Sequence, residues 1–266
     1  MSSGTRNTRT ALALALLMLV GGTCVSLGFW QLDRATERRA IAANIEQGRK
    51  ATAIELNNAT QEAHNFKNWT PATVQGRWRS DLSLLLDNRN LNGRPGLWLA
   101  TPLVIADGRA VLVLRGWFAR PLGENIAPIV PTSGSDQQLS GELAEHVPRL
   151  FELWSSAKPA NETLAFAGPA SSAARSEAID TNLLPRRQNL AVAELSKVSG
   201  LNFFPVVLLQ TSPANDGLIR TWPQPSVDAD KNTGYAMQWF GFAAICLIAL
   251  VVVVWRTRRS RSRRLF

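Results

Sequence analysis

The sequence predicts an α+β membrane protein in which two transmembrane helices flank a β-rich extracytoplasmic domain with one or two helices of its own. Two runs without a charged residue, 10–32 and 232–255, predict the transmembrane helices. Between them lie short segments rich in Val, Leu and aromatic residues, bounded by turn-forming residues, as is typical of strands. The expected division is a cytoplasmic N-terminus (1–10), a first span (11–31), the β-rich domain (32–233), a second span (234–255) and a basic cytoplasmic tail (256–266).

Both apolar runs are long enough to cross a bilayer. They contain 23 and 24 residues. At about 1.5 Å per helical residue each run is roughly 35 Å long, against a hydrocarbon core of about 30 Å. A cleaved signal peptide is disfavoured at the N-terminus, because the first run is longer than a usual signal-peptide core. We therefore expect two membrane spans.

The charged residues indicate how these spans are oriented. All 20 acidic residues lie between Asp33 and Asp230, whereas two arginines precede the first span and six follow the second. Lysine and arginine are enriched in cytoplasmic flanks of membrane spans. We expect both termini in the cytoplasm and the central domain in the periplasm of a bacterial inner membrane. Most of the formal net charge of +9 lies in these flanks. We therefore expect it to interact with membrane lipid and not with nucleic acid.

The segment between the spans predicts mostly strands, at 72–78, 82–89, 96–105, 110–119, 138–147 and 203–211. Asp107-Gly108, between two apolar runs, predicts a hairpin turn. The continuous apolar run 110–114 is typical of a strand buried on both faces. Apolar spacing predicts one helix at 190–200 with Gly200 as its C-cap. The Ala-, Ser- and Pro-rich segment 155–182 is expected to be a poorly packed insertion or loop.

No residue pattern predicts catalysis or a metal site. The two cysteines, Cys24 and Cys246, fall inside the expected spans, and His64 and His146 are the only histidines. None of the usual metal-ligand spacings or nucleophile motifs occurs. We therefore expect neither an enzyme nor a metal-binding protein.

Arg115-Gly116-Trp117, which follows the apolar run 110–114, allows two interpretations. In the first, Arg115 at a strand end pairs with a carboxylate and packs on Trp117. In the second, the three residues form a docking surface for a membrane partner.

Polar and aromatic residues gather where the two spans meet the non-cytoplasmic side: Trp30, Gln31, Tyr235, Gln238 and Trp239. Such aromatics are typical of the belt that settles at lipid headgroups. The amides of Gln31 and Gln238 could bond the two spans together. Gly22 and Ser26, four residues apart, would allow close approach of the helices.

Four blocks, in this order, are similar to the Surfeit locus protein 1 family, the Shy-type cytochrome c oxidase assembly factors: "LGFWQLDRATERR", "GRPGLWLATPL", "VLVLRGW" and "GYAMQWFGFA". The resemblance extends over roughly residues 28–245. It implies a non-enzymatic chaperone that assists haem a insertion into, or stabilisation of, the oxidase core subunit. The implied partners are membrane lipid, cytochrome c oxidase core subunit I and haem a synthase, with haem a as a transient cofactor. The rival hypothesis is a two-span scaffold or sensor with an exported β-domain and no haem.

The resemblance also implies a haem contact at the start of the second span. Bacterial relatives place a histidine three residues before the Tyr of "YA", and this chain has Asn232 there. A carboxamide is a poor ligand for haem iron. Three alternatives remain open: a substitute ligand such as His64, His146 or an oxidase residue, passage of haem without coordination, or a scaffold role. The residues implied to contact haem a or the partner are Trp30, Gln31, Asn232, Tyr235, Gln238 and Trp239.

Overall fold

The chain forms two structural units. The computed structural model describes residues 3–60, 66–121, 128–132, 134–148, 166 and 178–262, with the backbone alone for 3–7 and 260–262. Residues 1–44 and 225–266 form one unit, which we call the helical unit, and residues 45–224 form the other, the β unit. His64 and most of the expected insertion at 155–182 lie outside the described residues.

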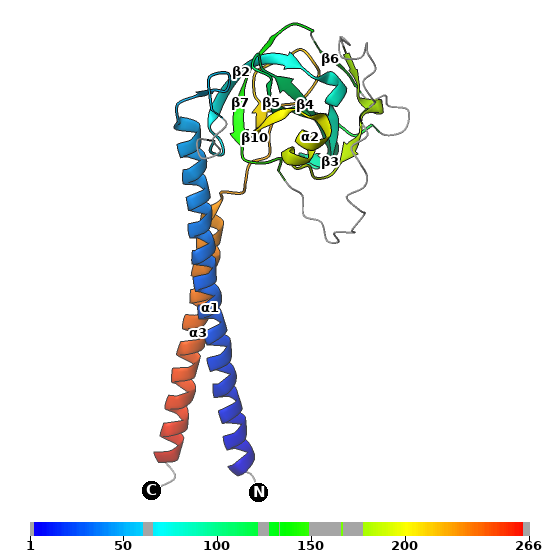
Figure 1. Ribbon diagram of the computed structural model, residues 1–266. Helices are drawn as coiled ribbons and strands as arrows, with labels where there is room; N and C mark the ends of the chain where they lie inside the picture. The colour runs from blue at the N-terminus through cyan, green and yellow to red at the C-terminus, as the bar shows by residue number, and fades with distance from the viewer. Residues whose placement is uncertain are drawn as a thin grey trace. The chain divides into compact units, whose positions relative to one another are not determined.

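Two long helices make up the helical unit, α1 (Ser3–Lys50) and α3 (Ala229–Ser262). They run antiparallel beside one another (Figure 1). In the part of the chain that the structure describes, the helices long and apolar enough to cross a membrane are Thr8–Lys50 and Ala229–Arg259. The expected spans 11–31 and 234–255 therefore fall inside these helices.

Helix α1 continues well past the expected end of the first span. Its 48 residues correspond to about 72 Å, more than twice the hydrocarbon core of a bilayer. Residues 33–47 contain neither Gly nor Pro and are rich in Ala, Arg and Glu, which favour helix. The last turn of α1, from Ile45, belongs to the β unit.

An eight-stranded sheet forms most of the β unit (Figure 1). Its strands are β1 (Ile54–Glu55), β2 (Pro71–Trp78), β3 (Leu84–Leu91), β4 (Arg94–Val104), β5 (Arg109–Ala119), β7 (Gln137–Ala144), β9 (Arg186–Arg187) and β10 (Asn202–Gln210). The order is β1-β2-β7-β10-β5-β4-β3-β9, and β2 also pairs with β4. The pairings from β2 through β7, β10, β5 and β4 thus return to β2, which closes the sheet on itself.

The strands expected from the sequence are confirmed as β2, β3, β4, β5, β7 and β10. The hairpin is confirmed as well: β4 and β5 pair antiparallel, and the Ile105 amide donates to the Arg109 carbonyl over 2.9 Å. Gly108 has φ +85° in this turn, a conformation that glycine adopts without steric cost.

Strand β5 is buried on both faces, as its apolar run predicted. Val111 and Val113 pack with Phe204 in one core cluster, while Leu112 and Leu114 pack in another. Helix α2 (Val192–Ser199) contributes Leu195 to the second cluster. Gly200 ends this helix in the left-handed conformation at φ 70°, so the expected C-cap is confirmed.

The described end of the segment 155–182 is ordered, contrary to expectation. It contains β8 (Ala178–Asp180), which pairs with β6 (Ile129–Pro131), and a 3₁₀ turn, η4 (Thr181–Leu183). A second 3₁₀ turn, η2 (Ser80–Leu82), precedes β3. Ile179 packs into a third core cluster. Three-residue strands are too short to show a periodic pattern, so the sequence predicted a loop at this position.

Buried Arg89 on β3 ties together segments far apart in the sequence. Its guanidinium lies 4.5 Å from the Trp98 ring and donates to the carbonyls of Pro148 and Gln188, both over 2.8 Å. Burial lowers the pKa of Arg89 to about 10, so the side chain stays charged at neutral pH. One side chain thus ties β3 to the segment that follows β7 and to the segment that follows β9.

Candidate functional site

The start of α3 is joined to α1 by a hydrogen bond between two candidate residues. The side-chain nitrogen Nδ2 of Asn232 donates to Oε1 of Gln31 over 2.6 Å. Asn232 is only 8% exposed. Gln31 thus bonds the two helices together as expected, with Asn232 as its partner, whereas Gln238 is exposed. The Asn232 amide is therefore hydrogen-bonded within the chain.

Further polar contacts lie next to this pair. Arg38 donates to the Asp228 carbonyl over 2.8 Å, and Arg39 donates to the Thr233 hydroxyl over 3.0 Å. We call these residues, together with the amide pair, the polar junction: Gln31, Arg38, Arg39, Asp228, Asn232 and Thr233. The junction links the start of α3 to α1, and every one of these hydrogen bonds uses a side chain of α1.

Below the polar junction, small residues allow the two helices to approach closely. A Cβ at Gly28 would come within 2.5 Å of the Phe240 ring, and a Cβ at Gly21 would lie 3.3 Å from Cβ of Cys246. Buried or half-buried positions on α1 follow spacings of three and four: Gly21, Cys24, Gly28, Gln31 and Ala35. This heptad-like pattern is typical of two helices packed at a shallow angle.

The close approach expected from Gly22 and Ser26 is wrong. Both residues are exposed, and a Cβ at Gly22 would meet nothing within 4 Å. The contact runs instead through Gly21 and Gly28. Successive residues of a helix are rotated by about 100°, so Gly22 points to a different side of α1 from Gly21.

The aromatic candidate residues point mostly outward. Trp30 is 58% exposed and Tyr235 is 52% exposed. Trp239 is half-buried and makes an edge-to-face contact with Phe242 at 6.0 Å between ring centroids. Outward aromatics agree with the belt hypothesis, while contact with haem or a partner stays a prediction. Of the six residues implied by the resemblance, Gln31 and Asn232 are the two that a hydrogen bond brings together.

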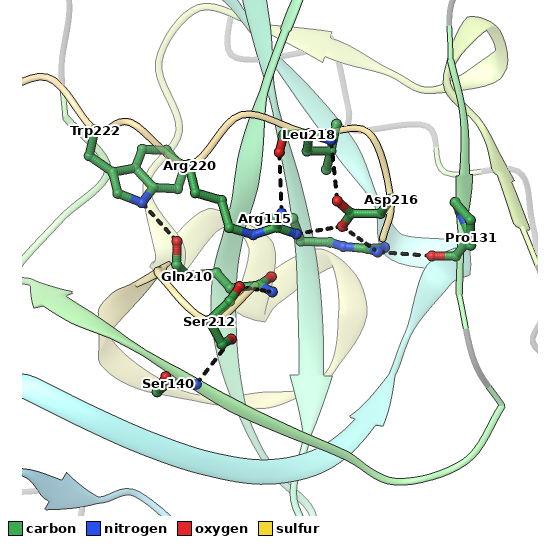
Figure 2. Close-up of polar contacts among 9 residues, drawn as sticks. All are labelled: Arg115, Pro131, Ser140, Gln210, Ser212, Asp216, Leu218, Arg220 and Trp222. Atoms are coloured by element: carbon green, nitrogen blue, oxygen red, sulfur yellow. Dashed lines mark hydrogen bonds and ion pairs between the residues drawn. The ribbon is translucent and has the colours of Figure 1, made fainter. Parts of the chain in front are cut away.

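In the β unit, Arg115 occupies a β-bulge. The register pairs Leu99 with Gly116 and Ala100 with Leu114, which leaves Arg115 as the extra residue of β5. Its side chain reaches the Pro131 carbonyl over 2.9 Å and the Asp216 carboxylate over 3.5 Å (Figure 2). Arg220 binds the same carboxylate over 2.5 Å.

The Arg115 cluster, which we define as Arg115, Asp216 and Arg220, carries a buried excess of positive charge. The side chains are 4%, 4% and 11% exposed, respectively. The pKa of Arg115 is lowered to about 10, chiefly by burial, with Asp216 raising it and the nearby Arg220 charge lowering it. Arg115 thus stays charged at neutral pH and depends on Asp216 as its carboxylate partner.

Gly116 and Trp117 also have structural roles. Gly116 has φ +157°, and a Cβ there would lie 2.7 Å from Cβ of Leu218. The Trp117 backbone exchanges two hydrogen bonds with Ile219, of 2.7 and 2.8 Å. The Trp117 indole donates to the Arg89 carbonyl over 2.7 Å and lies so close to Gly96 that a Cβ there would overlap it.

These contacts support the first interpretation of Arg115-Gly116-Trp117, with one correction. Arg115 pairs with a carboxylate as expected, but it stacks on Trp78 at 4.7 Å and not on Trp117. All three residues are buried, so a direct docking role through their side chains stays a prediction. Sequence reasoning missed Asp216 and Arg220, the charged partners of Arg115.

The candidate metal and redox residues are dispersed. Among the described residues no three His, Cys, Asp or Glu side chains come together as a metal site. His146 is exposed at the end of β7. Cys24 is buried and Cys246 half-buried in the contact between α1 and α3, and both are free thiols.

Comparison with known proteins agrees with the layout of these elements. The model of the SURF1 family matches residues 18–244, which include most of α1, the whole β unit and the first part of α3. The chain is 27% identical to a SURF1-like protein of Rickettsia bellii (strain RML369-C), over 90% of this chain and 88% of the relative. It is 26% identical to a SURF1-like protein of Rickettsia felis (strain ATCC VR-1525 / URRWXCal2), over 86% of this chain and 90% of the relative. The chain belongs to the SURF1 family.

Proposed function

We propose that this protein is an assembly factor for haem–copper cytochrome c oxidase that acts as a membrane-anchored scaffold on the oxidase core subunit. The observation that carries the proposal is the family match over residues 18–244. Proteins of this family are known as oxidase assembly factors. The proposed partners are core subunit I, haem a synthase and membrane lipid. We also propose that the protein is not an enzyme.

The surface of the helical unit supports a membrane location. Large apolar side chains are exposed along both helices, among them Leu12 and Leu19 on α1 and Ile245 and Leu247 on α3, each more than 60% exposed. Exposed apolar surface of this extent is unfavourable in water and favourable in lipid. The six arginines after residue 255 favour cytoplasmic termini, and the proposed location is a bacterial inner membrane with the β unit in the periplasm.

The residues at the family's haem position do not fit an iron ligand. The Asn232 carboxamide is buried and donates to Gln31, and an amide is a poor ligand for haem iron in any case. We infer that this protein supports oxidase assembly without coordinating haem a through Asn232. The hydrogen bond between Asn232 and Gln31 supports the scaffold alternative, because it uses the amide to hold the two helices together and not to bind iron.

The proposal is tested by deleting the gene and recording absorption spectra of the membranes. The expected result is loss of the a-type haem signal with the b- and c-type signals retained, and recovery when the wild-type gene is supplied on a plasmid. Immunoblots for the core subunit in the same membranes separate failed assembly from failed expression. An unchanged a-type signal in the deletion strain would reject oxidase assembly and favour a scaffold or sensor of other function.

A further inference from the structure

An apolar groove lies between α1 and α3, on the side of the Gly28 contact that leads toward the termini. Its volume is about 430 Å³, and it is lined by Leu17, Met18, Gly21, Gly22, Val25, Phe240, Ala243, Ala244, Cys246, Leu247 and Leu250. Figure 1 shows the two helices diverging toward the ends that carry the termini. The small residues Gly21, Gly22, Ala243 and Ala244 leave this space between the helices open.

The dimensions of the groove suit one hydrocarbon chain. It extends from Leu17 to Val25 on α1 and from Phe240 to Leu250 on α3, or about 12 and 15 Å at 1.5 Å per residue. One leaflet of a bilayer contributes about 15 Å of hydrocarbon. The groove therefore matches an acyl chain in length.

The ends of the helices beyond the groove carry only positive charge. Arg9 on α1 and Arg256, Arg258 and Arg259 on α3 are exposed, and no acidic residue occurs before Asp33 or after Asp230. Arg256 lies six residues beyond Leu250, or about 9 Å along the helix. The Arg259 guanidinium stacks on the Trp255 ring at 5.2 Å, a pairing suited to the headgroup level of a membrane.

We propose that the groove and this arginine flank form a site for one anionic phospholipid. One acyl chain lies in the groove, and the phosphate of the headgroup is bound by Arg256 and Arg259 on α3. Basic clusters between membrane helices on the cytoplasmic side are suited to anionic headgroups, and the charge complementarity selects an anionic over a zwitterionic lipid. The site rests on the membrane placement proposed above and is independent of oxidase assembly. The bound lipid stabilises the hairpin where the helices diverge.

The test uses the full-length protein, purified in detergent, delipidated and titrated by native mass spectrometry. The probes are phosphatidylglycerol and phosphatidylcholine with identical acyl chains. We expect one phosphatidylglycerol to be retained at least tenfold more tightly than phosphatidylcholine. Gly22→Leu fills the groove where an added Cβ meets nothing within 4 Å, and it should weaken phosphatidylglycerol at least tenfold. Gly241→Leu is the matched control, because this glycine is equally unobstructed but lies outside the groove lining.

A second pair of variants tests the headgroup. Arg256→Gln combined with Arg259→Gln should lower the preference for phosphatidylglycerol by about fivefold per arginine, while Arg34→Gln, an exposed arginine at the other end of α1's apolar run, should leave it unchanged. Equal binding of the two lipids, or equal retention by wild type and Gly22→Leu, would overturn the site. Extraction of the protein from membranes by alkaline carbonate would instead reject the membrane placement, and a normal oxidase in the deletion strain would reject only the assembly role.

Discussion

The side-chain nitrogen of Asn232 lies 2.6 Å from the side-chain oxygen of Gln31, and this hydrogen bond joins α3 to α1. Asn232→Leu leaves the Gln31 amide without this partner in an apolar helix contact. We expect the association of the two helices to weaken by about 1–2 kcal/mol. Gln31→Leu combined with Asn232→Leu should recover part of the loss, because neither side chain then retains an unpaired polar group.

Cross-linking reports this association directly. A Cβ at position 21 would lie 3.3 Å from Cβ of Cys246, close to the separation of about 3.5–4.5 Å in a disulfide. Gly21→Cys in a Cys24→Ser background should therefore cross-link to Cys246 on oxidation. When Asn232→Leu is added, the yield of cross-linked protein should fall as the detergent concentration is raised. Equal yields in the single, double and parent variants would mean that the amide pair contributes nothing to the hairpin.

Restoring an imidazole at position 232 should change the spectrum of the purified protein. The wild type, isolated from cells that make haem a, is expected to lack the absorption bands of a histidine-ligated haem. Asn232→His supplies an axial ligand and should acquire them, with Asn232→Gln as the control that keeps an amide. Haem a bound to the wild type and lost in Asn232→Leu would contradict the inference that Asn232 does not hold iron.

Gly116→Ala should destabilise the β unit by several kcal/mol. The added Cβ would meet Leu218 at 2.7 Å and would occupy a backbone conformation at φ +157° that other residues rarely adopt. Thermal unfolding of the detergent-solubilised protein measures the loss. Gly134→Ala is the control, because a Cβ there meets nothing within 4 Å, and a comparable melting temperature for the two variants would refute the steric account.

The Arg115 cluster predicts an order of stability among charge variants. Asp216→Asn leaves two buried guanidiniums without their carboxylate and should cost about 3–5 kcal/mol. Arg220→Met leaves Arg115 facing Asp216 one to one, so its loss should be smaller. Circular dichroism melts of the purified variants give the order, and a more stable Asp216→Asn than Arg220→Met would show that charge balance does not govern this cluster.

The parts of the fold that were predictable are those with local patterns. Two uncharged runs gave the long helices, and short segments rich in Val, Leu and aromatic residues gave the main strands. The Asp107-Gly108 turn and the Gly200 C-cap are equally local, since each depends on a glycine beside a periodic segment. The strands of two or three residues, such as β8, have no pattern to recognise.

The contacts of the candidate site were not predictable from local patterns. Arg115 and Asp216 are 101 residues apart, and Gln31 and Asn232 are 201 apart, so only the tertiary fold brings them together. Candidate residues could be named from their chemistry, because a buried arginine and an amide in an apolar run both need partners. The partner of Arg115 depends on the bulge in β5, and the partner of Asn232 depends on which side of α1 packs against α3. No local sequence pattern predicts either feature.

Arg89 has a consequence for how the β unit can come apart. Because one guanidinium binds the carbonyls of Pro148 and Gln188, the segments that follow β7 and β9 are tied to β3 by the same side chain. Loss of this charged donor leaves both carbonyls without it at once, so these two segments are expected to detach from β3 together and not one after the other.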